Sequence, residues 1–103
     1  MNYINLTPHA TRLNDGREFA PHGVIARVSS SYQKIDWETY IVEFGQIQNL
    51  PEPQNGLRYI VSALVEQATW NRPDVVSPAT GHPECIRQDG QIFSVPGFVK
   101  SRK

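Results

Sequence analysis

Apolar and polar positions alternate along several short stretches of the chain, the pattern expected of half-buried β-strands. Residues 2–6, 24–28 and 40–47 each contain an extended, apolar-rich run, and we expect a strand in each. Gly45 interrupts the alternation in the third stretch and predicts a β-bulge there. Residues 29–31, three successive serines, are expected to form a loop after the second strand.

Two Asp-Gly pairs predict tight hairpins. Asp15-Gly16 lies within residues 11–20, and Asp89-Gly90 lies within residues 86–95. Glycine adopts positive φ without steric cost, and Asp-Gly is a favoured pair in two-residue hairpin turns. Each pair is therefore expected to connect two antiparallel strands.

The stretch 59–76 has the order strand, helix, strand. Ser62 is a suitable N-cap, and residues 63–71 carry an apolar stripe at helical spacing. Pro73 ends the helix because proline disfavours helical backbone in the residue before it. Two short apolar strands, 59–61 and 74–76, flank this helix. If they pair in one sheet, the unit is a right-handed parallel crossover.

Length and composition place these elements in one domain, residues 1–103. Hydrophobic residues make up 39% of the chain, which is enough for a single modest core. We expect an α+β fold consisting of a β-rich curled sheet or small barrel. It would carry the two Asp-Gly hairpins, one main helix at about 63–71 and a βαβ unit over 59–76.

The charge balance narrows the range of partners. Ten Lys and Arg residues offset ten Asp and Glu residues, so the chain lacks the positive field that gathers DNA or RNA. General nucleic-acid binding is therefore not expected. The basic residues at 100–103 are expected to form a short solvated tail.

The single cysteine, Cys85, precludes a disulfide within one chain and favours a reducing, cytoplasmic setting. No apolar run is long enough to span a membrane. The first residues also lack the basic and apolar regions of a signal peptide. We therefore expect a cytoplasmic protein with no membrane partner.

The junction between the strand at 59–61 and the helix is the strongest candidate for a binding site. The start of a helix presents free backbone N–H groups and partial positive charge, which suit a phosphate or carboxylate. In a parallel unit, the end of the strand at 74–76 lies at the same edge, where ligands bind. Small or hydroxylated residues gather there in the sequence: Ser62, Ser77, Thr80 and Gly81.

Residues after the first strand extend this candidate site. Pro8 lacks a backbone N–H and ends strand pairing, so Thr7 and His9 lie at a strand end. A neutral histidine there can donate one hydrogen bond and accept another. Arg58 or Arg72 would neutralise a bound phosphate. The alternative interpretation is structural: an N-cap, two turns and surface arginines.

Other chemistries have weaker support. The chain contains neither GxxxxGK[ST] nor GxGxxG. His82 and Cys85 form one pair of zinc-type ligands, whereas a structural zinc normally has four. The sequence therefore predicts no metal and no cofactor. Three carboxylates near an aromatic pair are expected to face water rather than act as acid and base: Asp36, Glu38 and Glu43.

The large aromatic residues offer either packing or ligand stacking. We expect most of them to lie in the core, because that is where such side chains are usually found. This expectation covers Trp37, Tyr40, Tyr59, Trp70 and Phe98.

Four segments resemble a family of short uncharacterised proteins of bacteriophages, prophages and some bacteria. They are NLTPHA at 5–10, ARVSS at 26–30, GQIQNLPEPQNGLRYIVSALV at 45–65 and RPDVVSPATG at 72–81. The resemblance spans nearly the whole chain and preserves the order of the segments. It implies a small protein made in the cytoplasm of an infected bacterium. Several small phage proteins sequester nucleotide signals of bacterial immunity, and by analogy of context this favours an anionic ligand.

Three functions are compatible with these observations. The first is a non-enzymatic binding protein, expected to be a homo-oligomer, that holds a phosphate-bearing, nucleotide-like ligand near Ser62 and residues 77–81. The second is a small phosphodiesterase or nucleotidase that uses the histidines and scattered carboxylates. The third is a protein-interaction module that blocks a host protein, which would be marked by a broad exposed apolar patch.

Overall fold

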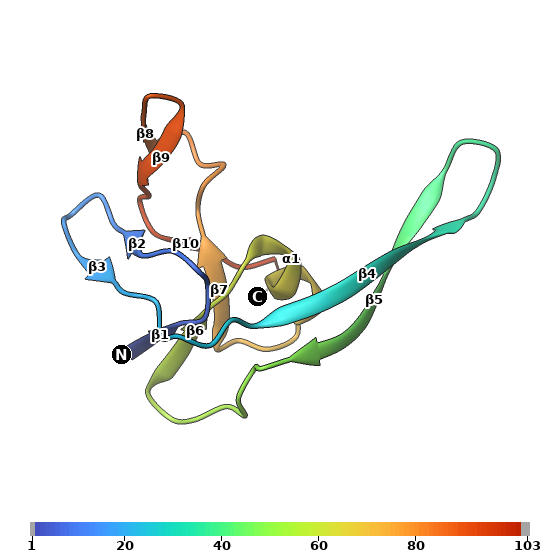
Figure 1. Ribbon diagram of the computed structural model, residues 1–103, viewed down its shortest axis with the longest axis horizontal. Helices are drawn as coiled ribbons and strands as arrows, with labels where there is room; N and C mark the ends of the chain where they lie inside the picture. The colour runs from blue at the N-terminus through green and yellow to red at the C-terminus, as the bar shows by residue number, and fades with distance from the viewer. Residues whose placement is uncertain (1, 102–103) are drawn as a thin grey trace.

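The computed structural model describes residues 2–101, and Figure 1 shows a body of short elements from which one long hairpin projects. The elements in chain order are β1 (Asn2–Asn5), β2 (Thr11–Arg12), β3 (Glu18–Phe19), β4 (Arg27–Lys34), β5 (Tyr40–Gln48), β6 (Leu57–Ile60), α1 (Ala63–Ala68), β7 (Val75–Pro78), β8 (Ile86–Gln88), β9 (Gln91–Ser94) and β10 (Phe98–Val99).

The body is built on a four-stranded sheet with the order β1-β6-β7-β10. Strand β6 runs parallel to both β1 and β7, and β10 is antiparallel to β7. The other strands form three two-stranded ribbons, and no sheet within the described residues closes into a barrel. A strand-rich α+β fold with a short helix is therefore confirmed. The small barrel, which the sequence offered as an alternative to a curled sheet, is not formed by the described residues.

The predicted βαβ unit is present. Tyr59 pairs with Val75 and Ile60 pairs with Val76 in a parallel ladder. Helix α1 connects these strands and packs against β7. The ends of β6 and β7 therefore meet at one edge of the sheet, as the sequence predicts.

Helix α1 is shorter than expected, because it ends at Ala68 rather than at residue 71. Thr69 leaves the helical conformation, with φ −119° and ψ 32°. Its hydroxyl donates a hydrogen bond to the Val65 carbonyl at 2.8 Å. This side-chain bond competes with continuation of the helix, so the helix ends before Pro73 acts.

The hydrophobic core joins the central sheet to α1 and to the segment before β4. Its buried members are Leu6, Ala26, Tyr59, Val61, Val65 and Val75. Val28 and Ile47 pack against this cluster and attach β4 and β5 to the body. The core is small, so each of its large side chains carries a substantial share of the stability.

Both Asp-Gly pairs form the predicted hairpin turns, one between β2 and β3 and one between β8 and β9. Asp89 and Gly90 have φ values of 53° and 78°, which is the combination that a type I′ turn requires. Gly16 has a φ of 97° in the first turn. Local turn chemistry therefore sets these two connections.

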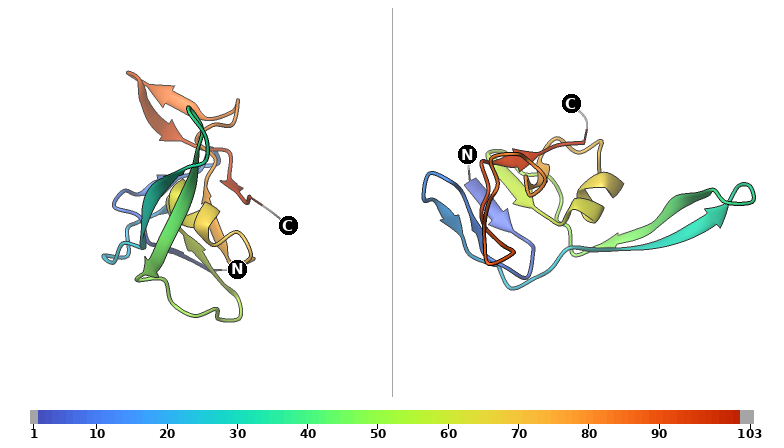
Figure 2. Two further views of the ribbon diagram at one scale, coloured as in Figure 1. Left: turned by 90° about the vertical axis from the view of Figure 1, so that its right-hand side faces the viewer. Right: turned by 90° about the horizontal axis from the view of Figure 1, so that it is seen from above.

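The projecting hairpin, which we call the arm, consists of β4, β5 and the turn at residues 35–39 (Figure 2). Two predictions are corrected here. Residues 29–31, which were expected to form a loop, lie inside β4, and the strand expected at 24–28 instead begins at Arg27. Ser30 pairs with Phe44 and Ser31 pairs with Glu43. The serines are extended because they pair with residues of β5. Three polar residues alone do not indicate this pairing.

The bulge predicted at Gly45 is confirmed at the base of the arm. Residues 45 and 46 lie opposite Ser29, between the pairs Val28–Ile47 and Ser30–Phe44. A Cβ atom at position 45 would clash with the Ser29 hydroxyl. Glycine therefore leaves room for the Ser29 side chain where the arm leaves the body.

The described part of the C-terminal segment is held by α1, which corrects the expected solvated tail. Glu66 is 2% exposed and accepts hydrogen bonds from Lys100 Nζ at 2.8 Å and from the Ser101 backbone N–H at 3.0 Å. The Ser101 hydroxyl also donates to this carboxylate. Residues 102–103 lie outside the described residues.

Glu66→Gln is expected to lower the free energy of unfolding by about 2 kcal/mol near neutral pH, because it removes hydrogen bonds to a buried charged acceptor. Burial raises the Glu66 pKa, but the Lys100 and Ser101 donors outweigh it, and the pKa lies below its usual 4.5. A lowered folded-state pKa stabilises the fold above about pH 4.5, and this contribution is lost as the pH falls through the lowered value.

Urea unfolding of the parent and of Glu66→Gln at a series of pH values checks this prediction. The difference between them should shrink on acidification, whereas the matched variant Glu43→Gln, on the exposed arm, should follow the parent at every pH. A difference that is absent or independent of pH would contradict the assigned role of Glu66.

Candidate functional site

A cleft of about 570 Å³, which we call the ligand cleft, brings together four segments that are distant in sequence. They are residues 7–12, 61–63, 78–80 and 91–95, although Ala79 itself does not line the cleft. Its volume lies within the range of about 300–1,000 Å³ that is typical of small-molecule sites. The edge of the βαβ unit thus forms one wall, and the two short hairpins complete the enclosure.

Four of the residues predicted from the sequence line this cleft: Thr7, His9, Ser62 and Thr80. They come from the segment after β1, the junction of β6 with α1 and the segment after β7. Much of the remaining lining is apolar: Pro8, Val61, Pro78, Ile92, Phe93 and Val95. A few polar groups on a largely apolar wall are the usual composition of a ligand site.

Asn5 holds the segment that contains Thr7 and His9. This side chain belongs to a residue that is 2% exposed, and its Nδ2 donates to the carbonyls of His9 at 2.8 Å and Phe19 at 2.9 Å. Its Oδ1 accepts from the Thr7 backbone N–H at 3.0 Å. Asn5 therefore fixes the turn after β1 and ties it to β3.

The two side chains on this turn contribute differently. The Thr7 hydroxyl lies 2.7 Å from Asn5 Oδ1 and 2.9 Å from the His9 carbonyl, so its proton is used within the turn. The His9 residue is exposed, and its imidazole makes no hydrogen bond with other residues in the 2–101 range. Its two ring nitrogens are therefore free to meet a ligand.

Ser62 caps α1, with φ −65° and ψ 159°, and its Oγ accepts from the Val65 backbone N–H at 3.3 Å. Accepting this bond leaves the hydroxyl proton available to a ligand. The helix has six residues, so its dipole is smaller than that of the longer helix expected. Ser62 therefore contributes a hydroxyl donor at the wall, and α1 supplies limited positive charge.

Arg12 lines the cleft but is not among the residues predicted from the sequence. Its guanidinium lies 4.8 Å from the centre of the Phe93 ring and forms an ion pair with Glu18 at 2.8 Å. Both side chains of that pair are 44% exposed, and exposed pairs of this kind contribute little stability. Arg12 can therefore exchange Glu18 for an anionic ligand at low free-energy cost.

The other predicted residues do not line the ligand cleft: Arg58, Arg72, Ser77 and Gly81. Arg72 binds Asp74 through two contacts, at 2.6 and 3.1 Å, and donates to the Pro51 carbonyl. Ser77 is 1% exposed, and its hydroxyl has no partner within the part of the chain that the structure describes. Arg72 thus serves the fold, and the cation at the cleft is Arg12.

No group of three or more His, Cys, Asp and Glu side chains converges among residues 2–101 as a metal ion would require. His82 Nδ1 accepts the Glu84 backbone N–H at 3.0 Å, which closes a local turn. Asp36 accepts from the backbone N–H groups of Glu38 and Thr39, and this lowers the Asp36 pKa. These two residues are thus engaged in turns.

Comparisons with protein-family models, with curated proteins and with solved structures each found no match to this chain. The structure contains no helix, within residues 2–101, of the length and apolar character needed to cross a membrane.

Proposed function

We propose that this protein is a non-enzymatic binding protein that holds a phosphate-bearing, nucleotide-like small molecule in the ligand cleft. The observation that carries the proposal is the convergence of polar side chains from four distant segments on a largely apolar cleft. Such convergence requires the folded chain and is typical of a preformed ligand site.

The lining suggests how the parts of such a ligand would be held. A planar ring would pack against Phe93 and Pro78, which lie on the apolar part of the wall. The phosphate would meet the Arg12 guanidinium, with hydrogen bonds from His9 and the Ser62 hydroxyl. In this arrangement the ring would make most of the contact area, and the polar groups would fix the orientation of the ligand.

Binding without turnover is favoured over hydrolysis by the composition of the cleft. Its lining includes one imidazole and one guanidinium but no carboxylate. A phosphodiesterase or nucleotidase needs a paired acid and base or a bound metal ion to activate water. The enzyme therefore remains the alternative, to be recognised by turnover of the nucleotide.

The resemblance to short phage and prophage proteins suggests the biological setting. The protein would act in the cytoplasm of an infected bacterium and sequester a nucleotide signal made by a defence system. Sequestration requires tight retention of an intact ligand, which is consistent with a cleft that lacks catalytic pairs.

A pair of isosteric substitutions at Ser62 tests the charge of the ligand. Asp and Asn are both good N-cap residues, so Ser62→Asp and Ser62→Asn should retain α1. An aspartate carboxylate would repel a phosphate in the cleft. We expect Ser62→Asp to bind the phosphorylated probe at least about tenfold more weakly than Ser62→Asn, equivalent to about 1.4 kcal/mol.

Calorimetric titration with ADP-ribose, cyclic ADP-ribose and a cyclic dinucleotide measures this difference, and adenosine serves as the probe without phosphate. Equal binding by the two Ser62 variants would show that the phosphate does not bind near Ser62 in the cleft. Consumption of a probe during the titration would instead support the enzyme.

A further inference from the structure

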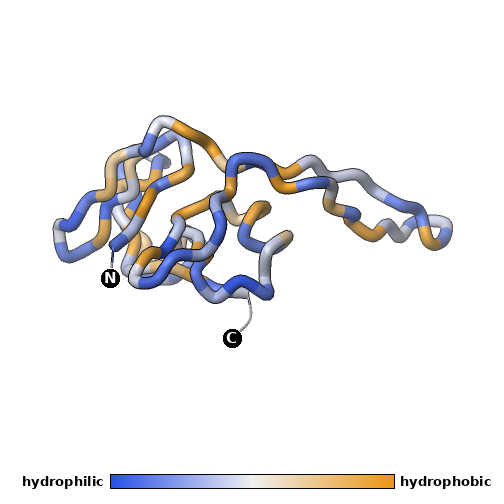
Figure 3. The backbone as a smooth tube through the Cα atoms, turned by 90° about the horizontal axis from the view of Figure 1, so that it is seen from below, coloured by the Kyte–Doolittle hydropathy of each residue, from blue (hydrophilic) through white to orange (hydrophobic). Residues whose placement is uncertain are grey.

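The arm exposes an apolar face that nothing in the described chain covers. Cross-strand pairing places Tyr32 beside Val42, with Phe44 and Tyr40 on either side of that pair on the same face. These four side chains belong to residues that are 75%, 46%, 39% and 54% exposed, respectively. The hydropathy colours of Figure 3 also show apolar residues recurring along the arm to its tip.

The opposite face of the arm is more polar, since Gln33, Ser31 and Glu43 lie there with Ile41. A two-stranded ribbon is marginally stable alone in water. The body covers only its base, where Val28 and Ile47 join the core. The outer half therefore has the one-sided character of a ribbon that packs against another surface.

The tip of the arm is also apolar and carries negative charge. Trp37 is 91% exposed and lies between Asp36 and Glu38 in the turn. This corrects the expectation that Trp37 is a core residue. The Lys34 ammonium lies 6.0 Å from the centre of the Trp37 ring, and the exposed indole with its flanking carboxylates would fit an apolar recess that has a further cation beside it.

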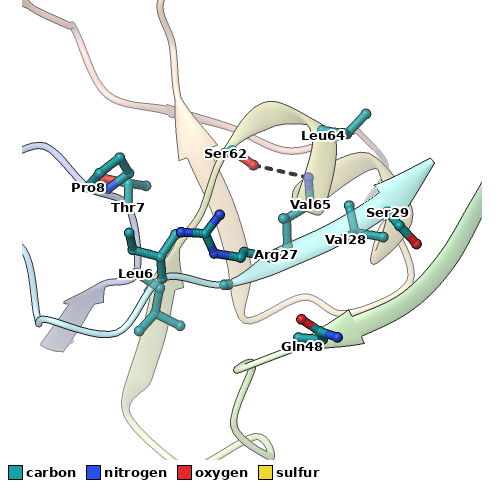
Figure 4. Close-up of a pocket in the computed structure, with 12 residues that line it drawn as sticks. Leu6, Thr7, Pro8, Arg27, Val28, Ser29, Gln48, Ser62, Leu64 and Val65 are labelled. Atoms are coloured by element: carbon teal, nitrogen blue, oxygen red, sulfur yellow. Dashed lines mark hydrogen bonds between the residues drawn. The ribbon is translucent and has the colours of Figure 1, made fainter.

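A second cleft of about 460 Å³ lies where the arm leaves the body, and we call it the base cleft. Leu6, Val28 and Leu64 contribute apolar side chains to its lining, and Arg27 contributes a guanidinium (Figure 4). Arg27 makes no ion pair with any residue in the 2–101 range. The base cleft therefore offers both features that the tip requires.

We propose that two copies of this chain dimerise by reciprocal docking of their arms. The arms would lie antiparallel around a two-fold axis at the Tyr32–Val42 pair, which places Phe44 of each copy against Tyr40 of the other. Trp37 lies five residues from Tyr32 toward the tip, and Val28, which lines the base cleft, lies four residues toward the base on the face of Tyr32. The same axis thus brings each tip to the base cleft of the other copy.

The exposed area is close to what a stable dimer needs. Five residues contribute exposed apolar side chains on this face and at the tip: Tyr32, Trp37, Tyr40, Val42 and Phe44. Together they present on the order of 600 Å² per chain, against about 800 Å² per partner in an interface of standard size. Because the dimer is two-fold symmetric, the same residues form both sides of the interface, and each copy buries this area.

Sedimentation velocity over a wide range of protein concentration tests this dimer. The parent is expected to dimerise, and Trp37→Ala is expected to raise the dissociation constant about 30-fold, as for a central aromatic anchor. Glu38→Lys should also weaken the dimer, whereas Glu43→Lys makes the same charge change on the polar face and should not. The double variant Arg27→Glu, Glu38→Arg restores opposite charges and should recover dimerisation relative to Glu38→Lys.

Circular dichroism and thermal melting of each variant confirm that the body remains folded, since the substituted positions lie outside the buried core. A parent that stays monomeric at every concentration would overturn the proposal, and would be the result expected if the arm docks only on a host protein. A dimer unaffected by the Trp37 and Glu38 substitutions would overturn it as well. None of these variants changes a residue of the ligand cleft, so failure of the dimer is distinguishable from failure of ligand binding.

Discussion

Asn5→Asp is expected to destabilise the fold by about 3 kcal/mol near neutral pH and to weaken ligand binding. Two donors of the amide are lost, and a buried carboxylate would face the carbonyls of His9 and Phe19. The substitution changes the shape of the side chain very little, so packing does not explain the loss. Because the turn with Thr7 and His9 depends on Asn5, the wall of the ligand cleft should loosen with it.

Urea unfolding measures this effect, and the exposed residue Asn2 in the same strand provides the matched variant Asn2→Asp. That control should unfold within about 0.5 kcal/mol of the parent. Acidification should recover part of the loss at position 5, because a protonated aspartate regains one donor. Parent-like stability of Asn5→Asp would contradict the role of Asn5 as the organiser of this turn.

Tyr59→Ala is expected to cost about 4 kcal/mol, a large share of the stability of a domain of this size. The Tyr59 residue is 0% exposed, and its ring belongs to the core cluster that joins β6, α1 and β7. Its hydroxyl donates to the Glu52 carbonyl at 3.1 Å. Truncation thus leaves a cavity at the centre of the βαβ unit and also removes a hydrogen bond.

The conservative variant Tyr59→Phe separates these two contributions. It keeps the ring and removes only the hydrogen bond, so it should cost about 1 kcal/mol in thermal or urea unfolding. Similar losses for Tyr59→Phe and Tyr59→Ala would show that the ring does not pack as described. Such losses would also contradict the inference that a small core holds the cleft-forming elements together.

The parts of the fold that could be predicted are those set by local chemistry. The Asp15-Gly16 and Asp89-Gly90 turns, the Ser62 cap and the Gly45 bulge each depend on residues near in sequence, and the structure contains all of them. The strand at residues 29–31 was missed because its extended form depends on pairing with β5. The end of α1 was missed because the Thr69 hydroxyl turns back onto the helix.

The candidate site likewise has a part that could be predicted from the sequence and a part that could not. The convergence of Ser62 and Thr80 could be predicted because the order of elements indicates a parallel βαβ unit, whereas Thr7 joins them through the parallel pairing of β1 with β6. Asn5 and Arg12 were missed because their roles depend on Phe19 and Phe93, which other strands bring near. The asparagine in the NLTPHA segment was a usable signal, since a polar side chain at the inner end of a strand needs partners.

Native mass spectrometry of the purified protein tests the central claim, retention of an intact phosphate-bearing ligand, most directly. The protein would first be exposed to lysate from bacteria with active nucleotide-signalling defences, with Ser62→Asp treated in parallel beside Ser62→Asn. We expect the parent to retain a nucleotide that is released chemically intact, and Ser62→Asp to retain far less than Ser62→Asn. An unliganded parent with the nucleotide still in solution would contradict the binding function, and an unliganded parent with the nucleotide degraded would identify an enzyme.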